Sequence, residues 1–245
     1  MESFFSGRRV LVTGSGRGIG HGLVCRLAEL YAEVFALTRS DSGIETLQRL
    51  QLPNVHPVQC DLEDWEATRK TVESIMPVDL LINNAGIFIG KSFLQTKQLS
   101  FDRTMSINVK AVINVSQVVA KSMIERQYPG SIVNVSSVAA IRAIEDHSAY
   151  SASKAALDAI TRVMAVELGA HKIRVNGVNP TVILTDMGRQ GWSDPAKANP
   201  LLDKIPLHRF GEVEEVVSCI LFLLSDQAKF VSGAHLPIDG GLLTR

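Results

Sequence analysis

Tyr150 and Lys154 stand four residues apart, in a stretch whose pattern predicts a helix over 149–168. Residues at this spacing are neighbours on one helix face, so the phenol and the ammonium can reach the same substrate atom. A free tyrosine has a pKa near ~10 and is a weak proton donor at neutral pH. A neighbouring ammonium lowers that pKa because it stabilises the phenolate. The pair therefore predicts a general acid, although the same two residues also occur together on ordinary solvated helices.

A glycine-rich turn lies near the start of the chain, between a short apolar run and a helical pattern. Its spacing is glycine, three residues, glycine, one residue, glycine, and Ile19 stands where the common dinucleotide fingerprint has its third glycine. Glycines allow the backbone to approach a ligand closely, and the amino end of the following helix attracts phosphate. A pyrophosphate site is the favoured interpretation, and a glycine-rich connection without a ligand is the alternative. The expected contacts are Gly14, Ser15, Arg17, Gly18, Ile19 and Gly20.

The end of the second predicted strand indicates which nucleotide binds. NAD-dependent sites commonly place an Asp or Glu there to hold the ribose hydroxyls. This chain has Arg39, whose planar guanidinium can hold a 2′-phosphate, and Arg17 adds a second cation. Either arginine alone is explained as a surface charge, but the two together favour NADPH or NADP+. Asp41 opposes this only weakly, because its offset suggests a loop position.

Short apolar runs alternate with helical patterns along nearly the whole chain of 245 residues. Several runs are continuously apolar, as in strands with both faces covered. The alternation predicts one α/β domain, residues 1–245, with a doubly wound parallel sheet of seven strands and helices on both faces. The predicted strands are 9–13, 33–37, 55–59, 78–82, 131–135, 174–178 and 235–237, and the predicted helices are 18–30, 44–49, 65–75, 101–126, 149–168 and 213–224.

The segment 187–206 interrupts this alternation with two glycines, three prolines and Trp192. Long loops late in a chain are often functional, so a lid over the substrate is one interpretation. A variable surface insertion is an equal alternative.

Composition argues against several classes of function. Lys plus Arg and Asp plus Glu each number 25, and no basic block is present, which disfavours nucleic acid and anionic membranes as partners. Cys25, Cys60 and Cys219 are too scattered for a disulfide framework or a zinc site, which indicates a reducing compartment. The longest apolar run, 216–224, is too short to span a bilayer. We expect a cytoplasmic protein without a bound metal.

Five motifs, in this order, resemble the classical branch of the short-chain dehydrogenase/reductase superfamily over essentially the whole chain. The resemblance implies a Rossmann-type fold and hydride transfer between a nicotinamide and a carbonyl carbon. It selects Ser137 over Ser136, because the family's serine lies 13 residues before its tyrosine, as Ser137 lies before Tyr150. The motifs are the turn 13–20, Asp61-Leu62, Asn83-Asn84-Ala85-Gly86, the set Ser137, Tyr150 and Lys154, and Asn179-Pro180.

The resemblance also implies a role for each matching residue. Ser137 would hold the carbonyl oxygen, Tyr150 would donate the proton, and Lys154 would lower the tyrosine pKa and bind the nicotinamide ribose. Asn108 would hold a water for a proton relay. From the residues alone, the amides of Asn83 and Asn84 can tie neighbouring strand ends together, which favours a structural role at least for Asn84. The implied cofactor contacts beyond the glycine-rich turn are Arg39, Asp61, Leu62, Asn83, Ala85, Gly86, Tyr150, Lys154, Pro180, Val182 and Thr185.

One departure from the family pattern sharpens the resemblance. Thr181-Val182 follows Asn179-Pro180, where many relatives have glycine. Together with the segment 192–195 and His147, this makes the chain similar to the dicarbonyl/L-xylulose reductases. That likeness implies NADPH-dependent reduction of small α-dicarbonyls, and of L-xylulose to xylitol, with His147 and Trp192 in contact with substrate beside Ser137 and Tyr150. The alternatives are a solvent-facing His147 and a Trp192 that packs the lid.

Two other functions stay open. One is a reductase of the same mechanism that acts on a 3-oxoacyl thioester or a steroid. The other is an NADP(H)-bound sensor or structural protein without turnover, against which the intact Ser137, Tyr150 and Lys154 argue. The predicted helix 101–126 is apolar on more than one face. The family resemblance implies a homotetramer with this helix and the next at an interface.

Overall fold

Successive side chains of a strand point to opposite faces of a sheet, and both faces of this sheet are covered by helices. The computed structural model describes residues 2–244 and contains one seven-stranded sheet, in the order β3-β2-β1-β4-β5-β6-β7, with every neighbouring pair parallel. The strands are β1 (Arg9–Thr13), β2 (Glu33–Thr38), β3 (Val55–Gln59), β4 (Leu80–Asn83), β5 (Ser131–Val135), β6 (Arg174–Pro180) and β7 (His235–Ile238). The predicted doubly wound parallel sheet is confirmed.

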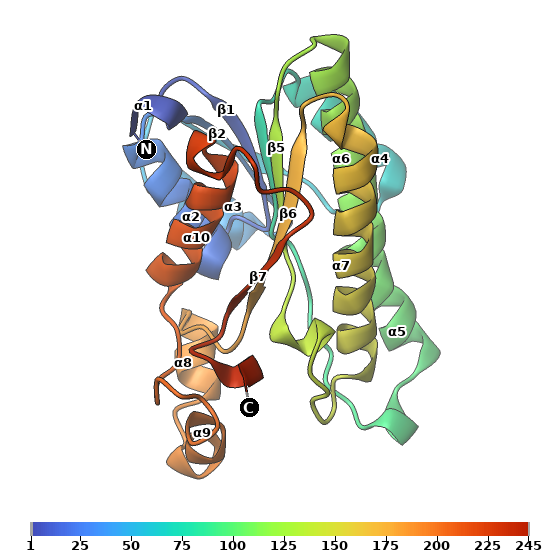
Figure 1. Cartoon of the computed structure of the whole chain (residues 1–245), viewed down its shortest axis with the longest axis vertical. Coiled ribbons are helices and arrows are strands. Elements are labelled where there is room, and N and C mark those ends of the chain that lie inside the picture. The colour runs from blue at the N-terminus through green and yellow to red at the C-terminus, as the bar shows by residue number, and fades with distance from the viewer. Residues whose placement is uncertain (1, 245) are drawn as a thin grey trace.

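Two apolar clusters fill the space between sheet and helices, one on each face. Val10 and Val12 of β1 belong to the first cluster, together with residues of the helices α2 (Gly18–Glu29), α3 (Asp41–Gln48) and α10 (Val213–Leu224). Leu11, between them, belongs to the second cluster, with residues of α4 (Trp65–Ile75) and α6 (Ala111–Glu125). Figure 1 shows α2 and α10 on one side of the sheet and α4, α6 and α7 (Ser148–Gly169) on the other. Burial on both faces accounts for the continuously apolar strands.

The ten α-helices of residues 2–244 include the short α1, which was not predicted; the others follow the predicted order, with three differences. The helix predicted over 44–49 starts three residues earlier, because the Ser40 hydroxyl accepts a hydrogen bond from the Gly43 amide and caps its first turn. Asp41 therefore begins a helix, and the expectation that it lies in a loop was wrong. The helices are α1 (Glu2–Phe5), α2 (Gly18–Glu29), α3 (Asp41–Gln48), α4 (Trp65–Ile75), α5 (Gln98–Met105), α6 (Ala111–Glu125), α7 (Ser148–Gly169), α8 (Asp186–Gly191), α9 (Pro195–Leu202) and α10 (Val213–Leu224).

The second difference concerns the helix predicted over 101–126. It begins at Gln98 and is divided into α5 and α6 by a π-helical turn, Ser106–Lys110. Asn108 lies in this turn, with its amide bonded to the backbone of Ile87 at 2.8 and 3.0 Å. Such turns are rare and occur frequently at functional sites.

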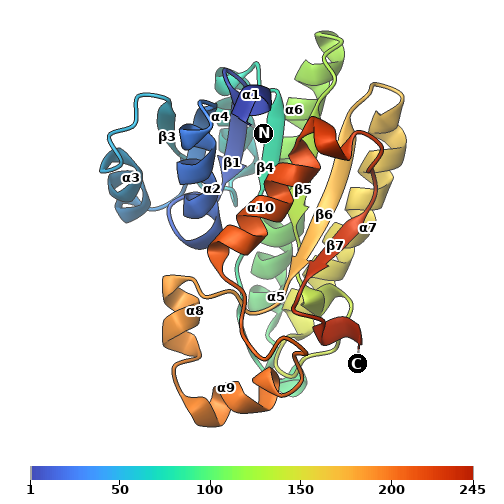
Figure 2. The same cartoon turned by 60° about the vertical axis from the view of Figure 1, so that its left-hand side comes forward.

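The third difference is the segment 187–206, where two helices were not predicted. Asp194 caps α9 by accepting a hydrogen bond from the Ala196 amide, and Pro195 occupies the first turn, where a missing N–H costs nothing. Figure 2 shows α8 and α9 beyond the carboxyl ends of the strands, away from the main helical layers. Across residues 2–244, the structure contains no helix of the length and apolarity needed to cross a membrane.

Candidate active site

The residues predicted to do chemistry gather at the carboxyl edge of the sheet. The chain runs outward from β1 in two directions, to β2 and β3 on one side and from β4 onward on the other. Ligands of open α/β sheets bind in the crevice where the strand order reverses in this way. The glycine-rich turn follows β1, the segment 83–86 follows β4, and Ser137 follows β5.

The glycine-rich turn lies directly against the loop after β4. Gly14 has φ +66°, and a Cβ placed there would lie 2.7 Å from the Cα of Ala85. Thr13 joins the same two loops, because its hydroxyl accepts hydrogen bonds from the amides of Asn84 and Ala85. The Asn84 side chain donates to the carbonyls of Thr13 and Gly14, each at 3.0 Å. The predicted structural role of Asn84 is confirmed.

Gly18 contacts a fourth segment at this edge, the one that contains Thr185. Its φ is +57°, and a Cβ there would lie 3.1 Å from Cγ2 of Thr185. The Thr185 hydroxyl accepts a hydrogen bond from the Gly188 amide and so caps α8. Pro180 ends β6 in the buried interior, and Val182 packs in a small apolar cluster beneath α9. Gly18 and Thr185 thus lie side by side, and contact of Gly18, Pro180, Val182 and Thr185 with the cofactor stays a prediction.

Several other residues that were predicted to contact the cofactor have contacts within the protein. The Ser15 hydroxyl donates to the Leu37 carbonyl at 2.8 Å, so this side chain ties the turn to β2. Asn83 is turned into the interior, where its amide donates to Ser116 and Asn134, both at 2.9 Å. The Asn83 side chain is therefore committed to structure, and the predicted contact of Asn83 with the cofactor stays a prediction. Ile19 packs against the cluster around α2, and Gly20 lies against the carbonyl of Gly14.

Two arginines follow the carboxyl ends of β1 and β2. Arg17 is exposed at the start of α2. The side chain of Arg39 is 55% exposed and lies 3.8 Å from Glu63, which pairs more closely with Arg103, at 3.1 Å. Asp61 is also exposed, and its carboxylate accepts a hydrogen bond from the Glu63 amide. Its neighbour Leu62 packs on the second apolar cluster. Among the residues that the structure describes, no carboxylate lies within 3.5 Å of either guanidinium, and both arginines are exposed.

Lys154 is buried, with 3% of its surface exposed. Its ammonium donates to the Val135 carbonyl at 2.8 Å and lies 5.6 Å from the centre of the Tyr150 ring. Burial lowers the pKa of Lys154 to about 8, and the nearby Asp158 acts in the opposite direction. A Cβ placed on Gly86 would lie 3.4 Å from the ammonium, so the loop after β4 passes close to this face of Lys154.

Ser137 and Tyr150 are neighbours, as predicted. Burial raises the pKa of Tyr150, and a hydrogen bond with the Ser137 side chain lowers it by a smaller amount. The expectation of an unusually acidic phenol was wrong, because burial destabilises the phenolate and raises the pKa of Tyr150. Ser137 also accepts a hydrogen bond from the Ala139 amide at 3.1 Å, which orients its hydroxyl at the start of a short 3₁₀ turn.

Asn108 is buried beneath these residues. Besides its bonds to Ile87, its amide donates to the Ser153 hydroxyl at 3.0 Å, and that hydroxyl donates to the Tyr150 carbonyl. Asn108 therefore joins the loop after β4 to the first turns of α7 and fixes both. The implied water relay stays a prediction.

His147 and Phe88 form an aromatic wall beside the phenol. Their rings are 4.4 Å apart, and Phe88 meets the Tyr150 ring edge-on at 5.4 Å. Phe88 was missed in the sequence, yet its side chain is 52% exposed. The available signal was an aromatic residue two positions after Gly86, in a loop expected to reach the site.

Trp192 lies apart from this wall in the segment after β6. It packs 5.4 Å from Phe210, with the Lys197 ammonium over its ring, and it belongs to a small cluster that includes Val138. This packing favours the interpretation of Trp192 as an anchor for the segment 187–206.

The arrangement matches a known family. Residues 14–243 match a family model described as Enoyl-(Acyl carrier protein) reductase. The chain belongs to the short-chain dehydrogenase/reductase family. It is 52% identical to L-xylulose reductase of Homo sapiens, over 98% of each protein. It is 48% identical to carbonyl reductase [NADPH] 2 of Sus scrofa, over 99% of each. These relatives confirm the predicted resemblance.

A solved structure gives the same fold. A gluconate 5-dehydrogenase from Burkholderia cenocepacia, in complex with NADP and tartrate, superimposes with a TM-score of 0.92 at 31% identity. The match covers 98% of this chain and 96% of that one. The Rossmann-type fold of the short-chain reductases is therefore confirmed.

Lys154→Met should remove a pH dependence of stability. Because the pKa of Lys154 falls from 10.5 to about 8 on folding, the unfolded chain binds more protons between these values. The stability of the wild type should therefore rise with pH across this window, relative to the variant, by about 3 kcal/mol. Urea unfolding of both proteins from pH 7 to 11 measures the difference. If the difference in the free energy of unfolding between the two proteins stays constant with pH, the lowered pKa of a buried Lys154 is contradicted.

Proposed function

We propose that this protein is an NADPH-dependent carbonyl reductase that reduces L-xylulose to xylitol and also reduces small α-dicarbonyls. The observation that carries the proposal is the convergence of Ser137, Tyr150 and Lys154 at the carboxyl edge of the sheet, where the glycine-rich turn also lies. The relatives named L-xylulose reductase and carbonyl reductase [NADPH] 2 support the substrate and the cofactor.

The residues at this edge of the sheet suit a dinucleotide. The glycines at 14 and 18 let the turn approach Ala85 and Thr185 closely, and Arg17 and Arg39 are exposed after β1 and β2. Arg39 suits a 2′-phosphate because a guanidinium can form two charge-assisted hydrogen bonds with it. When bound, NADPH supplies a hydride to the carbonyl carbon.

The chain's own residues handle the oxygen and its proton. Ser137 holds the carbonyl oxygen beside the phenol, and Tyr150 donates its proton to that oxygen as the alcohol forms. A raised pKa keeps Tyr150 protonated at neutral pH, which is the state that a reduction requires. Lys154 places a positive charge against the phenol and stabilises the phenolate that remains after transfer. Solvent then returns the proton to Tyr150.

Substrate selection belongs to the aromatic wall and to the segment 187–206. His147 and Phe88 stand beside Tyr150 and limit the space around the carbonyl. The segment 187–206 acts as a lid, anchored by Trp192 on Phe210 and by an ion pair of 2.6 Å between Arg189 and Glu212. Ion pairs between exposed side chains are weak, so this attachment can open at little cost.

Tyr150→Phe should abolish carbonyl reduction while NADPH still binds. The variant loses only the hydroxyl that donates the proton, so the rate should fall by about 10²- to 10⁴-fold. Oxidation of NADPH, followed by its absorbance with L-xylulose and diacetyl, measures the rate, and fluorescence titration measures binding. Turnover confined to a 3-oxoacyl thioester or a steroid would assign the same mechanism to another substrate. NADPH binding by the wild type without turnover of any carbonyl would favour the sensor.

Arg39→Asp should weaken the preference for NADPH over NADH. Loss of the charge-assisted bonds to a 2′-phosphate should raise the KM for NADPH by about 10- to 100-fold, with a far smaller change for NADH. Arg49→Asp is the matched control, because Arg49 is an exposed arginine at the end of α3, paired with Glu45. Steady-state kinetics with both cofactors gives the comparison. Equal changes in the two variants would make Arg39 an ordinary surface charge.

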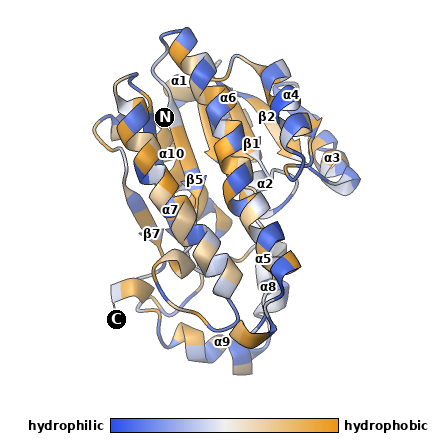
Figure 3. Cartoon of the chain, turned by 90° about the vertical axis from the view of Figure 1, so that its right-hand side faces the viewer, coloured by the Kyte–Doolittle hydropathy of each residue, from blue (hydrophilic) through white to orange (hydrophobic). Residues whose placement is uncertain are grey.

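The protein should assemble as a homotetramer. Apolar residues lie exposed on α5 and α7, among them Leu99 and Val166, the latter 82% exposed. Figure 3, which faces α5, α6 and α7, shows hydrophobic residues on these helices. Val166→Glu should dissociate the assembly, because a buried unpaired charge is costly. Light scattering gives the mass in solution, and a wild type that is a monomer would contradict the proposal.

A further inference from the structure

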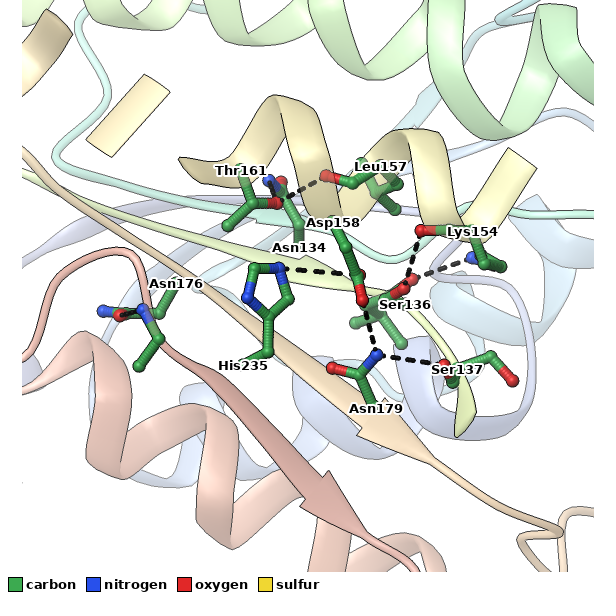
Figure 4. A network of polar contacts seen from close by, with 12 residues as sticks. Asn134, Ser136, Ser137, Lys154, Leu157, Asp158, Thr161, Asn176, Asn179 and His235 are labelled. Atoms are coloured by element: carbon green, nitrogen blue, oxygen red, sulfur yellow. Dashed lines mark hydrogen bonds and ion pairs between the residues drawn. The ribbon is translucent and has the colours of Figure 1, made fainter. Parts of the chain in front are cut away.

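A buried polar cluster lies behind the site, on the side of Lys154 away from the phenol. Asp158 follows Lys154 by one turn on α7 and is buried, with 6% of its surface exposed. Its carboxylate lies between Asn179 of β6 and His235 of β7 (Figure 4). Burial of a carboxylate is costly unless its partners compensate, so the cluster requires a reason.

Asn179 connects Asp158 to the backbone of Ser137. Its amide nitrogen donates to the Asp158 carboxylate at 3.0 Å and to the Ser137 carbonyl at 2.9 Å. Both amide protons are thereby used, and the Asn179 oxygen is buried without a partner. The contacts run without a break from the carboxylate to the residue whose hydroxyl meets Tyr150 (Figure 4).

His235 reaches Asp158 from across β6. Gly177 pairs with His235 in the sheet, and a Cβ on Gly177 would lie 2.8 Å from the imidazole, so only a glycine leaves room for the ring. The His235 Nε2 lies 3.5 Å from the Asp158 Oδ1, and each of these atoms lacks another partner. Burial lowers the pKa of His235, with a smaller opposite effect of Asp158 and a further lowering by Arg162. A neutral His235 leaves the charge of Asp158 to act on Lys154.

Few other charges act on Lys154 within residues 2–244. Tyr150 and Asp158 flank it on α7, and Asp158 raises its pKa. From the elements packed against α7, Asp102, Arg103 and Lys110 are exposed, and Arg174 of β6 bonds to carbonyls at the far end of the strand.

We propose that Asp158 is a positioning residue of the active site, which keeps Lys154 charged and fixes Ser137 through Asn179, while His235 confines the carboxylate from the far side of β6. The proposal rests on the proposed function for the roles of Ser137 and Lys154 in carbonyl reduction. It predicts that a carboxylate with no contact to substrate or cofactor sets the alkaline limit of activity.

Asp158→Asn tests the proposal, because it keeps the shape of the side chain and removes its charge. The pKa of Lys154 is measured by NMR from the pH dependence of the ¹³C chemical shift of its Cε. The resonance is assigned by its loss in Lys154→Arg. This pKa should fall by about one unit in the variant, because an opposite charge is lost. The alkaline limb of kcat/KM for carbonyl reduction should move down with it. Glu167→Gln, which removes an exposed carboxylate further along α7, should leave both unchanged.

An unchanged Lys154 pKa in folded Asp158→Asn would overturn the proposal, even if activity fell, since a merely structural role would lower activity alone. If that variant does not fold by circular dichroism, Asp158→Leu with His235→Leu replaces the polar pair by apolar side chains and should give the same shift. Failure of the proposed function is a separate result, because the NMR titration requires no turnover.

Discussion

The buried ammonium of Lys154 is the feature on which the rest of the site depends. A charge without solvent must find its partners within the protein, and here these are the Val135 carbonyl, the face of the Tyr150 ring and the nearby Asp158. Burial alone lowers the pKa of Lys154, so the charged state near neutral pH depends on what surrounds it. Gly86 lies close to the ammonium on one side, and the Asp158 carboxylate lies one turn further along α7.

Three asparagines hold the strand ends in register around this ammonium. Asn84 joins β4 to β1, Asn83 joins β4 to β5, and Asn179 joins β6 to the backbone of Ser137. Each stands at the carboxyl end of a parallel strand, where backbone groups leave the ladder and need new partners. Side-chain amides suit this position because each offers two donors and an acceptor. The asparagines in the motifs at 83–86 and 179–180 therefore fix the shape of this edge of the sheet, whether or not they also contact ligands.

The sequence predicted the sheet, its helices and the Ser137, Tyr150 and Lys154 set, because each depends on local periodicity or on a motif with fixed spacing. It did not predict α8 and α9, whose short helices depend on caps such as Asp194 and on packing around Trp192. It also gave the wrong sign for the Tyr150 pKa. The spacing of Tyr150 and Lys154 shows that an ammonium lies near the phenol. The burial that raises the phenol's pKa depends on segments that are distant in the sequence. Phe88 and His235 were missed for the same reason.

The two proposed tasks of this site, proton transfer and substrate selection, fall to different parts of the structure. The groups proposed to move the proton lie directly after β5 and on α7, two elements joined by buried hydrogen bonds such as that from Asn134 to Thr161. The groups proposed to choose the substrate belong to the loop after β4, the start of α7 and the segment 187–206. A change of Phe88 or Trp192 can therefore alter the substrate without disturbing the phenol and the ammonium. Loop substitutions of this kind allow one reduction mechanism to serve different carbonyl compounds among related chains.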